Sequence, residues 1–218
     1  MKKSIAFFLS FLISVICVGF LTGCDNQNNN DLSINQNPII TKVVPMQIAS
    51  SASGEASILA KVIENSEKYK FSQVEDSQIL KEQVQDGTYN FALLKTLDAA
   101  NLYKTSEKRI KIIASITKDC DWVLVVNVNY LDLNMNNVAE FMQDISASVD
   151  WIYSNQTDAI SVSEKDKLST KSQLQPLIKK KSFKYLDGDK MKTQLNKFFK
   201  KNESLVSAPK SDIYFIRT

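Results

Sequence analysis

Short apolar runs that alternate with helix-length amphipathic segments constrain the fold of this 218-residue chain more than any other feature. Runs of four to eight apolar residues bounded by turn signals are typical of strands buried on both faces. The strand candidates are residues 41–48, 70–74, 89–94, 110–116, 122–128 and 183–186. Their alternation with helices predicts βαβ units, and therefore an α/β domain whose mostly parallel sheet is flanked by helices.

The strongest helical pattern covers residues 136–154, where apolar side chains recur at i, i+3, i+4 and i+7. These side chains are Val138, Phe141, Met142, Ile145, Val149 and Ile152. Further helices are predicted at residues 54–68 and 96–103, from Asp76 or Ser77 to Gly87, around Glu164 and Ser172, and from Asp187 or Asp189 onward. Ser53 is the expected N-cap of the first of them.

The first 24 residues have the organisation of a secretory signal. Lys2 and Lys3 precede an uncharged apolar stretch over residues 5–21, which ends in Leu21-Thr22-Gly23-Cys24. This ending resembles the lipobox of bacterial lipoproteins. The resemblance implies cleavage before Cys24 and a covalent diacylglycerol or acyl lipid on its thiol. The alternative is an uncleaved transmembrane helix, since the apolar run is near the lower limit for crossing a bilayer.

The lipobox divides the chain into a signal peptide at residues 1–23, a flexible tether at residues 24–38 and an α/β lobe at residues 39–218. The tether is rich in Asn, Gln and Asp and has almost nothing to bury. A lipid on Cys24 places the lobe at the extracytoplasmic face of the cell membrane. No cofactor other than this lipid is expected.

The residue types that are missing exclude several classes of chemistry. The sequence has no histidine, which removes Ser-His-Asp and Cys-His catalysis and any His-containing zinc site. No motif for a catalytic or metal site is found, so no enzyme is expected. Loss of Lys2 and Lys3 leaves 25 basic against 24 acidic residues, because the whole chain has 27 and 24. This balance offers no argument for nucleic-acid binding.

Cys120 is the remaining cysteine once Cys17 leaves with the signal and Cys24 carries lipid. An internal disulfide is therefore impossible in the mature chain. A small buried side chain is the favoured interpretation of Cys120, and a reactive thiol is the alternative.

Loops at three strand ends hold candidate ligand-binding residues, because ligands of parallel α/β sheets bind beyond the carboxyl ends of the strands. Hydroxyls and free N–H groups after the first strand suit a polar or anionic solute. Hydroxyl and ammonium groups also follow the strands that end near residues 94 and 116. The candidate residues are Ser50, Ser51, Ser53, Lys95, Thr96 and Thr117. Ordinary helix capping by Ser53 and Thr96 is the alternative. The run Lys179-Lys180-Lys181 is interpreted as a solvated helix end.

Residues 91–104, Phe-Ala-Leu-Leu-Lys-Thr-Leu-Asp-Ala-Ala-Asn-Leu-Tyr-Lys, resemble the substrate-binding lipoproteins of ABC importers. The similarity is to the branch that includes nitrate, sulfonate, taurine and thiamine-precursor binding proteins. Residues 138–155 and 196–215 also resemble that family. The segment that would build a second lobe is missing, as is the Gly-Gly of the family's closing motif, where Ser207 and Ala208 stand.

The resemblance implies a single lobe of a type II periplasmic-binding-protein-like fold, which would be the solute-binding component of an ABC importer or a reduced derivative of one. Its implied partners are the membrane, an ABC permease and a small polar or anionic solute. A surface lipoprotein that acts as a protein-interaction or structural module without solute capture is the alternative. An enzyme of thiamine-precursor synthesis is a third, less favoured one, because histidine and a cysteine motif are absent.

Overall fold

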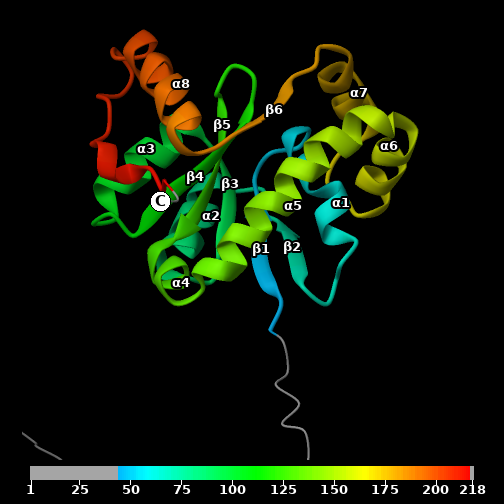
Figure 1. Cartoon of the computed structure of the whole chain (residues 1–218), viewed down its shortest axis with the longest axis horizontal. Coiled ribbons are helices and arrows are strands. Elements are labelled where there is room, and N and C mark those ends of the chain that lie inside the picture. The colour runs from blue at the N-terminus through cyan, green and yellow to red at the C-terminus, as the bar shows by residue number, and fades with distance from the viewer. Residues whose placement is uncertain (1–43, 217–218) are drawn as a thin grey trace, which may run out of the picture. The chain divides into compact units, whose positions relative to one another are not determined.

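The computed structural model describes residues 44–216, which form one sheet with helices on both faces (Figure 1). The strands are β1 Met46–Ser50, β2 Tyr69–Gln73, β3 Phe91–Lys95, β4 Ile110–Thr117, β5 Trp122–Asn127 and β6 Phe183–Leu186. The helices are η1 Glu55–Leu59, α1 Ala60–Ile63, α2 Ser77–Asp86, α3 Thr96–Thr105, α4 Val128–Leu133, α5 Met135–Ser154, α6 Gln156–Lys165, α7 Lys171–Lys179, α8 Gly188–Lys201 and η2 Ser211–Ile213.

The strand order across the sheet is β2-β1-β3-β5-β4-β6. β1 pairs in parallel with β2 and β3, whereas β5 is antiparallel to both β3 and β4, and β6 is antiparallel to β4. Strands β1 to β4 therefore point the same way, which confirms the α/β class, but the sheet is mixed, since two of the five pairings between these six strands are parallel and three are antiparallel. The β4–β5 connection departs from a pure βαβ pattern, because the turn over residues 118–121 is too short for a parallel crossover.

The sheet separates two apolar clusters, and alternate residues of its strands contribute to each. In β3, Phe91 and Leu93 belong to the cluster under η1, α1, α5, α6 and α7, whereas Ala92 and Leu94 belong to the cluster under α2, α3 and α8. The central strands are thus buried on both faces, which explains why the sequence shows continuous apolar runs there.

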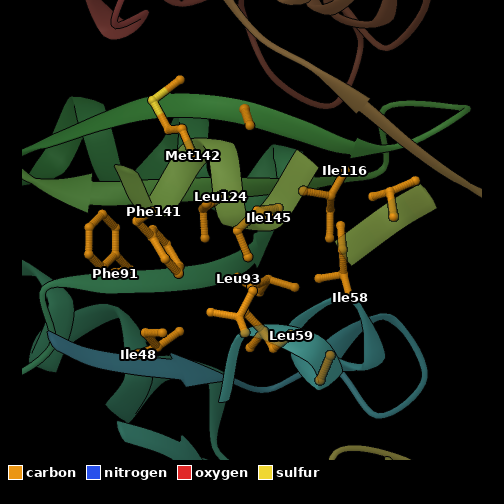
Figure 2. Close-up of a cluster of buried hydrophobic side chains, with 14 of the residues drawn as sticks. Ile48, Ile58, Leu59, Phe91, Leu93, Ile116, Leu124, Phe141, Met142 and Ile145 are labelled. Carbon is orange, nitrogen blue, oxygen red and sulfur yellow. The ribbon is translucent and has the colours of Figure 1, made fainter. Parts of the chain in front are cut away.

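Helix α5 is the main cover of the first cluster, as Figure 2 shows for Phe141, Met142 and Ile145. The Phe141 ring centroid lies 4.2 Å from that of Phe91 in β3 and 5.4 Å from that of Tyr69 in β2. All six apolar residues that predicted this helix are buried, so its period and its inward face are both confirmed.

The segment after β1 differs from its prediction. The expected long helix is a five-residue 3-10 helix, η1, followed by the four-residue α1, and the chain then turns at Asn65. The Asn65 carbonyl accepts hydrogen bonds from the backbone N–H groups of Lys68 and Tyr69, which ends the helix early and starts β2. The expected N-cap Ser53 is wrong as well, because Gly54 occupies that position and no side chain caps it.

Other predicted boundaries are confirmed closely. Asp76 is the N-cap of α2, where its carboxylate accepts from the N–H groups of Gln78 and Ile79. Gly87 ends the same helix in the left-handed conformation.

The lysines at residues 179–181 are exposed at the end of α7. The C-terminal segment after η2 is attached to β4, because the backbone N–H of Phe215 donates a hydrogen bond to Ile112 O over 2.9 Å.

The predicted signal peptide, Cys24 and the tether at residues 24–38 lie outside the described residues. Within residues 44–216, no helix combines the length and apolarity needed to cross a membrane.

Candidate functional site

A pocket of about 590 Å³ lies at the edge of the sheet where β1 and β2 end. Its walls come from the loop after β1, the end of β2, the α6–α7 connection and the first turns of α7. The lining residues are Ser51, Ser53, Gln73, Glu75, Glu164, Lys167, Leu168, Ser169, Thr170 and Gln173. The pocket therefore occupies the position at which parallel α/β sheets hold ligands.

The serine loop supplies one wall. Ser51 and Ser53 line the pocket, whereas Ser50 is fully buried beneath it and its Oγ accepts from Ala52 N over 2.9 Å. Gly54 brings this loop against α7, since a Cβ there would lie 2.8 Å from Leu177 Cδ1. The loop and α7 are in contact because residue 54 has no side chain.

The opposite wall is the α6–α7 connection, which its own hydrogen bonds hold in place. Glu164 Oε1 accepts from Lys171 N over 2.8 Å, and Thr170 N donates to Gln173 Oε1 over 3.0 Å. Leu168 is buried, which fixes the middle of the connection to the core. Lys167 has a left-handed backbone conformation with φ of 57°. A non-glycine residue rarely adopts this conformation.

The end of β2 contributes two residues that the sequence interpretation missed. Gln73 and Glu75 line the pocket, and Gln73 Nε2 donates to Ala52 O in the serine loop over 3.2 Å. The strand-end rule that selected the serine loop applies equally to residues 73–75. The same rule could therefore have predicted Gln73 and Glu75 as site residues. No local sequence pattern indicates that the α6–α7 connection would line a pocket.

The remaining predicted site residues lie outside this pocket, around the β4–β5 turn. Thr96 is buried, and its hydroxyl donates to Cys120 O. Thr117 Oγ1 accepts from Trp122 N over 3.2 Å. Lys95 is exposed at the end of β3. The structure thus separates Lys95, Thr96 and Thr117 from Ser51 and Ser53.

Cys120 itself is 4% exposed, as expected for a small buried side chain. Burial raises the pKa of its thiol, which favours the protonated form.

The pocket lining is rich in hydroxyl and amide groups and has an excess of negative charge. Glu75 and Glu164 face a single lysine, Lys167, and within residues 44–216 none of the three takes part in a salt bridge. The same part of the chain contains no group of three or more His, Cys, Asp or Glu side chains that could hold a metal ion. The lining suits recognition of a polar solute by hydrogen bonds.

No protein-family model matches the sequence, and no curated protein sequence matches it. Solved structures do match. A crystal structure of an ABC transporter from Parabacteroides distasonis superposes with a TM-score of 0.66 at 11% identity, covering 80% of this chain and 99% of that chain. A Candida albicans protein reported to exhibit the generic periplasmic binding protein structural fold gives 0.55 at 9% identity, covering 78% and 93%. The described residues have the periplasmic binding protein fold.

A third match is the ligand binding component of an ABC-type import system from Staphylococcus aureus, crystallised with zinc bound. It gives a TM-score of 0.56 at 11% identity and covers 79% of this chain and 96% of that chain. At such identities the likeness establishes the fold of this chain. Within the periplasmic binding protein fold, the pocket lies at the strand-end edge of the sheet.

Proposed function

We propose that this protein is a membrane-anchored solute-binding component of an ABC importer, without catalytic activity of its own. The observation that carries the proposal is the polar pocket at the carboxyl ends of β1 and β2 in a sheet of the periplasmic binding protein fold. The ABC-transporter origin of two structural matches supports the same class of function.

The proposed ligand is a small polar solute that is neutral or carries an amine. Hydroxyls of Ser51, Ser53 and Thr170 can donate or accept, and the Gln73 and Gln173 amides can do both. An anion would face two carboxylates against one ammonium group, which disfavours it. A single lobe covers the solute from one side, so we expect weaker binding than in a closed two-lobed cleft.

A thermal-shift screen of the chain without its first 24 residues tests solute binding. The panel contains sugars, polyols, amino acids, small amines, sulfonates and thiamine precursors, each at millimolar concentration. A ligand present at a hundred times its Kd stabilises the folded state by about 2.7 kcal/mol. The proposal predicts a clear rise in Tm with at least one neutral or amine-bearing solute.

Two matched variants locate the site. Ser53→Trp places an indole in the pocket and should abolish the ligand-induced shift. Lys95→Trp makes the same change at an exposed strand end outside the pocket and should leave the shift intact. If Lys95→Trp abolished the ligand-induced rise in Tm and Ser53→Trp did not, the result would indicate that the solute binds at the β4–β5 turn instead. No shift with any compound would contradict solute capture and favour the protein-interaction or structural module.

Membrane attachment through Cys24 has its own test. Mass spectrometry of the protein from a bacterial membrane fraction should find an N-terminal peptide that begins at lipid-modified Cys24. Cys24→Ala should leave the signal uncleaved and the lipid absent. A peptide retaining residues 1–23 in the unsubstituted protein would contradict the proposed anchor.

A further inference from the structure

Helix α8 presents a line of lysines on the side opposite its buried face. Met191, Leu195 and Phe199 pack into the second apolar cluster. Lys190, Lys197 and Lys201 follow at i, i+7 and i+11, a spacing that places them within about 20° of one line along the helix. All three are exposed, and Lys200, which is also exposed, lies about 80° from that line on the same solvent side of the helix.

The acidic side chains of α8 itself do not balance these lysines. Residues 165–201 contain 12 lysines and 3 aspartates, although the chain as a whole is close to neutral. In α8 itself Asp189 is the one acid, and it lies in the first turn. Among residues 44–216, no salt bridge includes a lysine of α8. A solvated helix face usually carries interspersed charges of both signs, so this segregation points to an anionic partner.

We propose that the lysine face of α8, formed by Lys190, Lys197, Lys200 and Lys201, docks on an anionic lipid surface. The face borders the β4–β5 turn, where Lys118 and two acidic residues, Asp119 and Asp121, line a hollow together with Lys197 and Lys201, so the excess of positive charge is carried by α8 itself. A helix of this length spans about 21 Å, enough for its lysines to meet several lipid headgroups at once.

The sequence supplies a reason for choosing a bilayer as the partner. The proposed lipid on Cys24 would hold the lobe at a membrane, where a basic surface on the lobe is attracted to anionic lipids. The chain between Cys24 and Val44 spans up to about 70 Å when extended, which lets any face of the lobe reach the bilayer. Electrostatics then decides which face docks. This inference does not depend on the solute pocket.

Vesicle sedimentation of the chain without its first 24 residues tests the proposal. Vesicles of equal parts phosphatidylcholine and phosphatidylglycerol are compared with pure phosphatidylcholine at low and high salt. The test variant changes Lys190, Lys197 and Lys201 to Glu. The control changes Lys70, Lys95 and Lys171 to Glu, which alters net charge equally on three separate elements. Circular dichroism verifies that both variants are folded.

We expect salt-sensitive binding to the anionic vesicles, lost at least about tenfold in the α8 variant and nearly unchanged in the control. Equal losses in the two variants would show an effect of net charge and overturn the proposal. So would absence of binding by the unsubstituted protein. Displacement by inorganic phosphate at constant ionic strength would identify a site for a free anion, and binding to an acidic protein but not to vesicles would identify a protein partner. Either result would also overturn it.

Discussion

Cys120 lies in the β4–β5 turn with a left-handed backbone, φ of 59°, and a buried side chain. In the chain without its first 24 residues it is the sole cysteine, so a thiol reagent reports on it alone. Because burial raises the pKa of this thiol, we predict that it reacts on the order of tenfold or more slowly in the native protein than in denaturant at pH 8. Equal rates would show that the thiol is accessible.

Asp212 forms an ion pair with Lys108, whose Nζ lies 2.6 Å from Oδ2. The hydrogen bond from Lys108 is the largest cause that lowers the pKa of Asp212 to about 2. A carboxyl whose pKa falls on folding stabilises the native state above its unfolded pKa of about 3.9, and the contribution disappears as pH falls toward 2.

We therefore predict that Asp212→Asn lowers Tm slightly at pH 7 and by much less at pH 2, where the carboxyl is about half protonated in the folded protein and almost fully protonated in the unfolded chain. The effect is small because both side chains are about half exposed, and added salt should reduce it further. Thermal unfolding followed by circular dichroism at the two pH values checks this, with an NMR titration of the carboxyl as a direct measurement. An unchanged difference at pH 2 would assign the effect to something other than charge.

At the scale of single elements, α5 is the helix on which the first cluster depends. Phe141 is fully buried against Phe91 and Tyr69. Phe141→Ala removes these contacts and leaves a cavity, so we predict a loss of about 3–5 kcal/mol in the free energy of unfolding. Gln143→Ala, on the exposed side of the same helix, should change it by less than about 0.5 kcal/mol. Urea titration compares them, and similar values would contradict the packing.

The end of α2 depends on Gly87, whose φ is +89°. A Cβ there would meet Asn127 Nδ2 at 3.8 Å, an ordinary contact, so a substitution is costly through the backbone alone. Gly87→Ala should destabilise the protein by about 1–2 kcal/mol. Gly87→Asn should cost less, because asparagine tolerates the left-handed region. If urea titrations showed a larger loss of unfolding free energy for Gly87→Asn than for Gly87→Ala, the size of the side chain rather than the backbone conformation would limit residue 87.

At the scale of the whole molecule, the two apolar clusters share every central strand, so neither can be lost alone. All their buried residues lie between Met46 and Tyr214. We predict that a protein comprising residues 44–218 folds and unfolds in one cooperative transition. Tryptophan fluorescence, which reports on Trp122 and Trp151 at the first cluster, should coincide with far-UV circular dichroism in denaturant. Separate midpoints would show that the clusters unfold independently.

The candidate site shows which of its residues local sequence patterns can predict and which they cannot. The serine loop was predicted because strand, polar loop and helix are consecutive in the chain, and Ser51 and Ser53 do line a pocket. Lys95 ends β3 and Thr117 ends β4, and the same rule selected both, yet they lie outside the pocket. The difference comes from the α6–α7 connection, which forms the second wall of the pocket at the ends of β1 and β2, whereas β3 and β5 separate β1 from β4 in the sheet.

The sequence by itself determined the α/β class, the buried strands and the inward face of α5, because burial on one or both faces imposes its period on neighbouring residues. The tertiary structure alone decided that β5 lies between β3 and β4. It also decided which strand ends share a pocket. These features depend on contacts between residues distant in the chain, and such contacts leave no periodic pattern in the sequence.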